Sequence, residues 1–154
     1  WDTALDGRLT RAEIRSLAAH EFGHVEANHI WKSIAWLVLF AVLGAFVVAR
    51  VTRRRGGLGR PAAVPLALLT FTVLGLAALP ATNAISRRYE AEADWLAIRA
   101  TRDPRAFEGL TRRLAEASLA QPDPPRWAVL LLETHPSPLE RIAMSRAAAL
   151  RGGS

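Results

Sequence analysis

The sequence contains no cysteine and, at Lys32, a single lysine among its 154 residues. The absence of cysteine excludes disulfide bridges, thiolate metal sites and cysteine nucleophiles, and it leaves the redox compartment open. Positive charge has essentially one source, because the formal net charge of +6 comes almost entirely from arginine. These arginines are scattered and lack the interleaved aromatic residues of a nucleic-acid surface, so we expect no nucleic-acid partner.

Charge is missing altogether from two long stretches. Residues 33–49 contain no charged side chain, and neither do residues 61–86. Hydrophobic residues make up 51% of the sequence, which is high for a soluble protein of this size. Either run alone could be a buried core helix, but two such runs are too apolar for a domain this small to bury. We therefore expect residues 33–49 and 62–84 to form a transmembrane helical hairpin.

The loop between the two runs, residues 50–60, carries five arginines. By the positive-inside rule this loop favours the cytoplasm, which would place the opposite end of the hairpin outside. Lys32, Arg87 and Arg88 lie at that opposite end. Because both ends are basic, the charge bias leaves the orientation open.

A helix is expected before the first run, over residues 10–30. Thr10 and Glu13 fit a capping box, in which each side chain binds the backbone N–H group of the other residue. Apolar residues then recur at helical spacing, and a bend near Gly23 would lead the helix into the first run.

After the hairpin, residues 86–154 are expected to form further helices. Residues 87–120 predict one or two amphipathic helices with a break near residues 103–104, where an Asp-Pro pair occurs. A proline-rich turn at 121–125 precedes a last helix at about 138–151. The predicted fold is mostly α, with a catalytic helix and a ligand helix joined by the hairpin.

The motif His20-Glu21-Phe22-Gly23-His24 has the form HExxH and lies on the first predicted helix. Residues four apart share one face of a helix, so both imidazoles can reach one zinc ion. Glu21 is then aimed at the open coordination position, where it can deprotonate a water molecule. The alternative is a surface helix with two incidental histidines.

A catalytic zinc needs a third protein ligand. Of the remaining histidines, His29 lies about 140° further round the helix than His24 and is expected to face away, as a polar residue near the membrane boundary. Glu90 and Asp94 share one helical face, whereas Glu92 points roughly opposite. We expect Glu90 to bind the metal and Asp94 to accept the outer N–H of a ligand imidazole. The alternative is a solvated acidic face.

The hairpin explains how these distant motifs meet. A chain that crosses the membrane twice returns to its starting side, so His24 before the first run and Glu90 after the second reach the same interface. Neither motif predicts this proximity alone.

Three sequence stretches in this order resemble one family: AHEFGHVEANH, then PATNAISRRYEAEAD after the two runs, then THPSPLERIA. They are similar to the integral-membrane zinc proteases of the type I CaaX prenyl protease and HtpX group, an HExxH, gluzincin-like class. The resemblance extends from the opening DTALD to the C-terminal helix. The family's upstream portion, with further membrane helices and a substrate-binding edge strand, is missing, so we expect residues 1–154 to be a partial peptidase domain.

The resemblance implies a role for each matching position. His20, His24 and Glu90 match the zinc ligands, Glu21 the catalytic glutamate and Asp94 the outer carboxylate. Two further positions near the substrate site are matched by His135 and Arg141, either of which could stabilise the oxyanion.

The expected function is zinc-dependent hydrolysis of peptide bonds, with one zinc ion per chain. We expect a peptide or protein substrate, a bilayer around the hairpin and a multi-pass location in a bacterial plasma membrane. One alternative is a catalytically silent membrane scaffold, against which the intact Glu21 argues. Another is a transport module, but the two runs offer no charged residue or histidine for a pathway.

Overall fold

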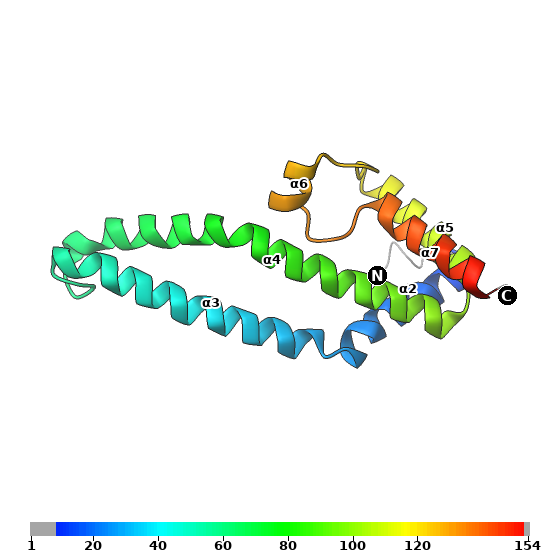
Figure 1. Cartoon of the computed structure of the whole chain (residues 1–154), viewed down its shortest axis with the longest axis horizontal. Helices are drawn as coiled ribbons and strands as arrows, with labels where there is room; N and C mark the ends of the chain where they lie inside the picture. Colours follow the sequence, from blue (N-terminus) through cyan, green and yellow to red (C-terminus); the bar gives the residue numbers. More distant parts are fainter. Residues whose placement is uncertain (1–8, 153–154) are drawn as a thin grey trace. The chain divides into compact units, whose positions relative to one another are not determined.

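The computed structural model describes residues 9–152, which contain helices and no strand, so the prediction of a mostly α fold is confirmed. The opening DTALD segment lies outside these residues. The helices follow in the order α2 (Arg11–Glu26), α3 (His29–Thr52), α4 (Val64–Thr101), α5 (Pro104–Ala117), α6 (Arg126–Leu131) and α7 (Pro138–Gly152), with 3-10 turns at Arg53–Arg55 and Pro61–Ala63 (Figure 1).

The chain divides into two compact units. A helical unit comprises Trp1–His29 and Asn83–Ser154, and a hairpin unit comprises Ile30–Thr82. The long helices α3 and α4 each contribute residues to both units, so the hairpin connects two segments of the helical unit.

The hairpin unit consists of most of α3 and the first part of α4, which run antiparallel on either side of the arginine-rich loop (Figure 1). Each helix contains an 18-residue stretch that is apolar enough to cross a membrane, with mean hydropathies of 2.4 and 2.2 for the two stretches. Large apolar side chains such as Phe46 and Phe71 are exposed along them. The helices extend beyond the charge-free stretches from which they were predicted, and α4 continues without interruption into the acidic segment.

Helix α2 begins with the expected capping box. The Glu13 backbone N–H donates to Thr10 Oγ1 at 3.3 Å, and the Thr10 backbone N–H donates to Glu13 Oε2 at 2.7 Å. The helix ends at Glu26, short of the expected residue 30, because Asn28 adopts the left-handed region with φ of 56°. The chain therefore turns between Glu26 and His29, and Gly23 lies inside a continuous helix.

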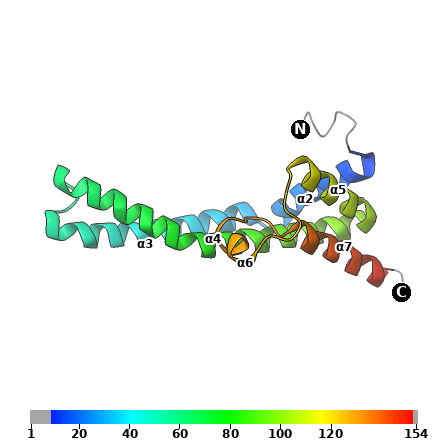
Figure 2. The same ribbon diagram turned by 90° about the horizontal axis from the view of Figure 1, so that it is seen from above.

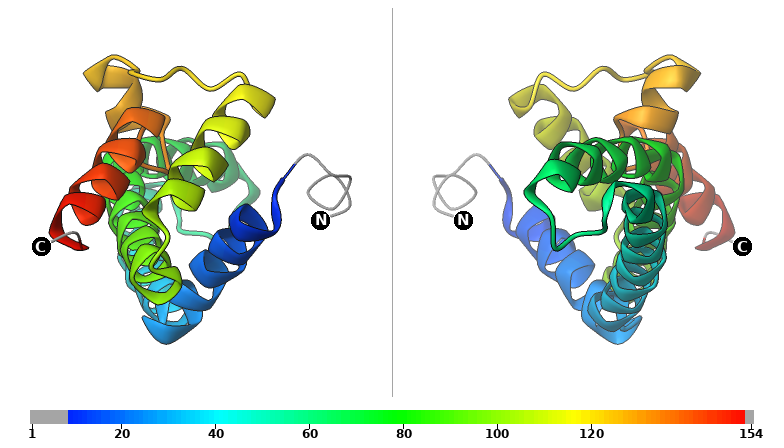
Figure 3. Two further views of the ribbon diagram at one scale, coloured as in Figure 1. Left: turned by 90° about the vertical axis from the view of Figure 1, so that its right-hand side faces the viewer. Right: turned by 90° about the vertical axis from the view of Figure 1, so that its left-hand side faces the viewer.

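The core of the helical unit forms where four helices meet. Phe107 of α5 is fully buried beside Ala97 and Ile98 of α4, with Ala19 and Met144 packed against this group. Helix α5 contacts both α2 and α7 (Figure 2, Figure 3). These contacts fix the HExxH helix and the acidic part of α4 within one packed body.

Ion pairs reinforce this packing at the surface of α5. Arg113 Nε lies 2.9 Å from the buried carboxylate of Glu13 on α2. Glu108 accepts hydrogen bonds from Arg112 on its own helix and from Arg146 on α7. Helix α5 is thus tied to both of its neighbours.

Candidate metal centre

The two histidines of the HExxH motif point to one place. His20 and His24 lie one turn apart on α2, and their Nε2 atoms are 3.1 Å apart. His20 is buried and His24 is half-buried. This spacing leaves the Nε2 atom of each ring available to a shared metal ion.

Gly23 allows α2 to approach α4 closely at this point. A Cβ atom at Gly23 would lie 3.1 Å from the carbonyl oxygen of Ala93 and 3.2 Å from its Cα atom. Both atoms belong to backbone, which cannot swing aside as a side chain can. A larger residue between the two motif histidines would therefore push α2 away from the acidic face of α4.

Glu90 of α4 completes a three-ligand cluster. Its Oε2 atom lies 3.4 Å from His20 Nε2, and its Oε1 atom lies 3.5 Å from His24 Nε2. Ligands about 2.0–2.1 Å from a tetrahedral zinc ion are about 3.3 Å from one another. The 3.1–3.5 Å separations match that spacing, and two imidazoles with one carboxylate are a donor set that zinc prefers. The residues thus fit a zinc ion.

Asp94 supports the first histidine from behind. Asp94 Oδ1 lies 2.8 Å from His20 Nδ1, so the carboxylate holds the outer nitrogen of this ring while Nε2 faces the cluster. Asp94 is fully buried, and Arg141 of α7 neutralises it with Nε 2.7 Å from Oδ2 and Nη2 2.6 Å from Oδ1. This fork also fixes the orientation of the carboxylate, because two parallel N–H bonds restrict its rotation.

His29 supports the second histidine, contrary to the expectation that it faces away. Its Nδ1 atom lies 3.1 Å from His24 Nδ1, and its Nε2 atom lies 3.3 Å from Glu92 Oε2. The ring is buried and stacks on Tyr89, with centroids 4.4 Å apart. The helical-wheel argument was wrong because the turn at Asn28 redirects the chain. It also missed Glu92, which reaches this ring.

The pKa values of His20 and His24 shift in opposite directions because the two rings have different neighbours. Burial lowers the pKa of His20, but the contacts with Asp94 and Glu90 outweigh it and raise the pKa to about 9. Burial lowers the pKa of His24, and the neighbouring rings of His20 and His29 add to this effect against the opposing charge of Glu90.

The carboxylates of half-buried Glu90 and buried Asp94 both stay ionised. Burial raises the pKa of Glu90, but a hydrogen bond from His20 and the nearby His135 outweigh it and lower the pKa below its ordinary value. In the same way His20 and Arg141 lower the pKa of Asp94 against the effect of burial. Glu90 therefore offers an ionised oxygen to a divalent cation, while Arg141 balances the charge of Asp94.

His135 approaches the cluster from the loop between α6 and α7. Its Nε2 atom lies 3.3 Å from Glu90 Oε2, and its Nδ1 atom lies 3.0 Å from Thr134 Oγ1. Arg87 of α4 holds both α6 and the start of this loop, because its Nη1 atom donates to the carbonyl oxygens of Val129 and Glu133. The paired arginines after the second apolar run were the only sequence signal for this contact.

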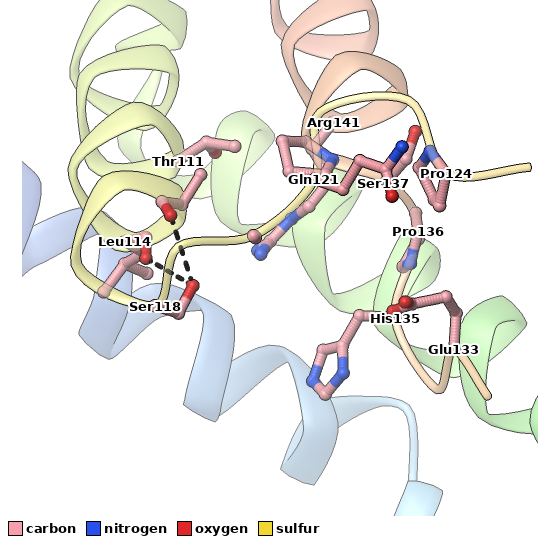
Figure 4. Close-up of a pocket in the computed structure, with 13 residues that line it drawn as sticks. Thr111, Leu114, Ser118, Gln121, Pro124, Glu133, His135, Pro136, Ser137 and Arg141 are labelled. Atoms are coloured by element: carbon pink, nitrogen blue, oxygen red, sulfur yellow. Dashed lines mark hydrogen bonds between the residues drawn. The ribbon is translucent and has the colours of Figure 1, made fainter. Parts of the chain in front are cut away.

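An open pocket of about 250 Å³ adjoins His135. Figure 4 shows His135 and Arg141 on its wall, with Ser137 and Gln121 nearby.

Glu21 is exposed on α2, and its charge acts on the pKa of His24. The structure thus brings together His20, His24, Glu90 and Asp94. Arg141, which was also predicted to lie near the site, contacts Asp94 directly.

Known proteins are similar to this chain in sequence or in fold. The sequence is 35% identical over 152 residues to the uncharacterized metalloprotease YhfN of Bacillus subtilis, covering 92% of this chain and 35% of the relative. The crystal structure of Ste24p from S. mikatae superposes with a TM-score of 0.78 at 22% identity, over 93% of this chain and 37% of that one. The chain thus spans about a third of the length of each.

The profile of one family accounts for nearly the whole sequence. It matches residues 2–149, a range that includes the HExxH helix, the hairpin, the acidic part of α4 and the loop with His135. With that extent of agreement, the chain belongs to peptidase family M48.

Proposed function

We propose that this chain carries the catalytic centre of a membrane-embedded zinc metalloendopeptidase. The observation that carries the proposal is the convergence of His20, His24 and Glu90, whose ligand atoms lie at the mutual distances of a tetrahedral zinc site. Membership of a peptidase family supports hydrolysis of peptide bonds as the reaction.

Glu21 is the residue we assign to proton transfer. When bound, a zinc ion supplies Lewis acidity, which polarises a carbonyl and makes water a better acid. Glu21 accepts the proton of the attacking water as the new C–O bond forms. It returns that proton to the leaving amine as the C–N bond breaks. The carboxylate needs no partner other than water and substrate for this role, in keeping with its exposure.

His135 and Arg141 take different parts in this proposal. The His135 imidazole is solvent-accessible and within 3.3 Å of Glu90, so it can donate a hydrogen bond to negative charge that develops on the substrate carbonyl. Two N–H groups of Arg141 already donate hydrogen bonds to Asp94. We therefore assign the oxyanion to His135, and to Arg141 the task of positioning His20 through Asp94.

The hairpin gives the proposed enzyme its location. Residues 33–49 and 62–84 lie in the two helices that are long and apolar enough to cross a membrane, and their large side chains face outward. We propose that both helices span a bacterial plasma membrane and that further spans belong to a longer protein. The substrate is then a peptide or protein that reaches the membrane surface.

The proposal is tested by comparing the wild-type chain with Glu21→Gln in detergent. Both proteins are expected to hold one zinc ion per chain, whereas only the wild type should cleave a peptide library or casein. Retained cleavage in Glu21→Gln would remove this residue from the mechanism. Zinc binding without any cleavage by the wild type would favour a non-catalytic scaffold.

A further inference from the structure

Helix α6 leaves large apolar side chains exposed among the residues that the structure describes. Trp127 is 62% exposed and Leu132, the residue after the helix, is 65% exposed. Leu130 and Leu131 are also exposed, and Ala128 is the only buried residue that α6 contributes. A six-residue helix with this surface gains little by lying in water, so its sequence needs an apolar environment outside the unit.

Arg87 ties α6 to the end of the second apolar run. Its Nη1 atom lies 2.6 Å from the carbonyl oxygen of Val129 and 2.7 Å from that of Glu133. These carbonyls lie near the C-terminal end of α6, where backbone acceptors lack helical partners. A charged donor to two such acceptors makes a strong attachment.

The position of Arg87 in the chain limits how far α6 can lie from the bilayer. Arg87 comes three residues after residue 84, the end of the proposed second span. Three residues rise about 4.5 Å in a helix and cover about 10 Å even when fully extended. The headgroup region on each side of the hydrocarbon core is about 5–8 Å thick. The Arg87 side chain adds its own length to this reach, so a helix bound to Arg87 lies in or just outside the headgroup region.

We propose that α6 is an interfacial helix whose apolar face, Trp127 with Leu130, Leu131 and Leu132, inserts between lipid headgroups. This inference rests on the membrane span of the proposed function. The composition fits the location, because tryptophan prefers the headgroup level and the Arg126 stem can extend its charge toward phosphate. Over 123–133 the chain has two acidic residues and one arginine, so apolar burial and not anionic lipid drives the insertion.

Insertion of α6 has a consequence for the metal centre. The chain runs from α6 through Glu133 directly to His135, which lies 3.3 Å from Glu90. A helix fixed in the interface therefore anchors the loop that carries His135. The site would then receive its substrates at the level of the membrane surface.

The absence of native cysteine allows a direct test by spin labelling. Single variants Leu132→Cys, Phe71→Cys and Leu150→Cys carry a nitroxide in the full chain, reconstituted in neutral phosphatidylcholine vesicles. Leu132 reports on α6, Phe71 on the proposed span, and Leu150 is an 82% exposed leucine of α7 that serves as the matched control. The readout is collision with oxygen, which concentrates in lipid, relative to a water-soluble nickel complex.

We expect the oxygen-to-nickel ratio at Leu132→Cys to be several-fold higher than at Leu150→Cys and to approach that at Phe71→Cys. A nickel-accessible label at position 132 beside a lipid-exposed label at 71 would overturn this inference and leave the span intact. Protection of position 132 from both reagents would also overturn it, because protein would then cover α6. A nickel-accessible label at position 71 would refute the span and this inference together.

Discussion

His29 Nδ1 lies 3.1 Å from His24 Nδ1, so the second metal-site histidine is oriented by another histidine, whereas the first is oriented by a carboxylate. When His24 Nε2 binds a metal ion, its Nδ1 carries the proton and His29 Nδ1 accepts the hydrogen bond. His29 Nε2–H then donates toward Glu92 at 3.3 Å. This chain of contacts selects one tautomer of each ring.

His29→Ala should therefore weaken zinc binding by about 10–100-fold, the usual effect of losing a residue that orients a metal ligand. Chelator competition at fixed pH measures the affinity. Glu92→Gln serves as the milder comparison, because it keeps a hydrogen-bond acceptor for His29. Unchanged zinc affinity in His29→Ala would show that the contact has no effect on the metal site.

Gly23→Ala tests the close approach between α2 and α4. The added methyl would lie 3.1 Å from Ala93 O, so the helices must separate at an expected cost of about 1–3 kcal/mol in the free energy of unfolding. The unfolding temperature measured in detergent and the affinity for zinc should both be lower than in the wild type.

The matched control is Gly44→Ala, a helical glycine of α3 whose added methyl would contact nothing within 4 Å. Its stability and zinc affinity should equal those of the wild type or slightly exceed them, because alanine favours helix. Equal behaviour of the two variants would contradict the assigned role of Gly23.

The sequence predicted the site best where residues lie within one helix and their spacing alone fixes which face they share. His20 and His24 share a helical face by their spacing, and so do Glu90 and Asp94, so each pair needed only a helix to be placed correctly. The meeting of the two pairs needed the further inference that a hairpin returns the chain to its starting side.

What the sequence did not predict depends on breaks and tertiary contacts. Asn28 adopts φ of 56°, and this single residue moves His29 from the far side of a continuous helix to the back of His24. Arg141 reaches Asp94 only because α7 packs beside α5 over the buried Phe107. No spacing rule specifies such contacts across distant segments.

The bridge between α5 and α7 should make stability depend on pH in the acid range. Hydrogen bonds from Arg146 and Arg112 lower the pKa of Glu108 from its ordinary 4.5 to about 2. Since the pKa is lower in the folded state, the unfolded chain takes up the proton first. The stabilisation is therefore complete above about pH 5 and is lost as the pH falls toward 2.

Glu108→Gln should accordingly unfold at a lower temperature than the wild type at pH 7, and the difference should shrink below about pH 4. Glu116→Gln, on an exposed position of the same helix, controls for loss of one negative charge. A difference between Glu108→Gln and wild type that is constant over pH would contradict the ionic origin of this stabilisation.

The central claim is that His20, His24 and Glu90 together hold zinc, and X-ray absorption at the zinc edge tests it most directly. The purified chain should show two imidazole nitrogens and a carboxylate oxygen about 2.0–2.2 Å from zinc. The same measurement on Glu90→Ala should show loss of zinc or of the carboxylate shell. A spectrum with three imidazoles, or one left unchanged by Glu90→Ala, would contradict the account.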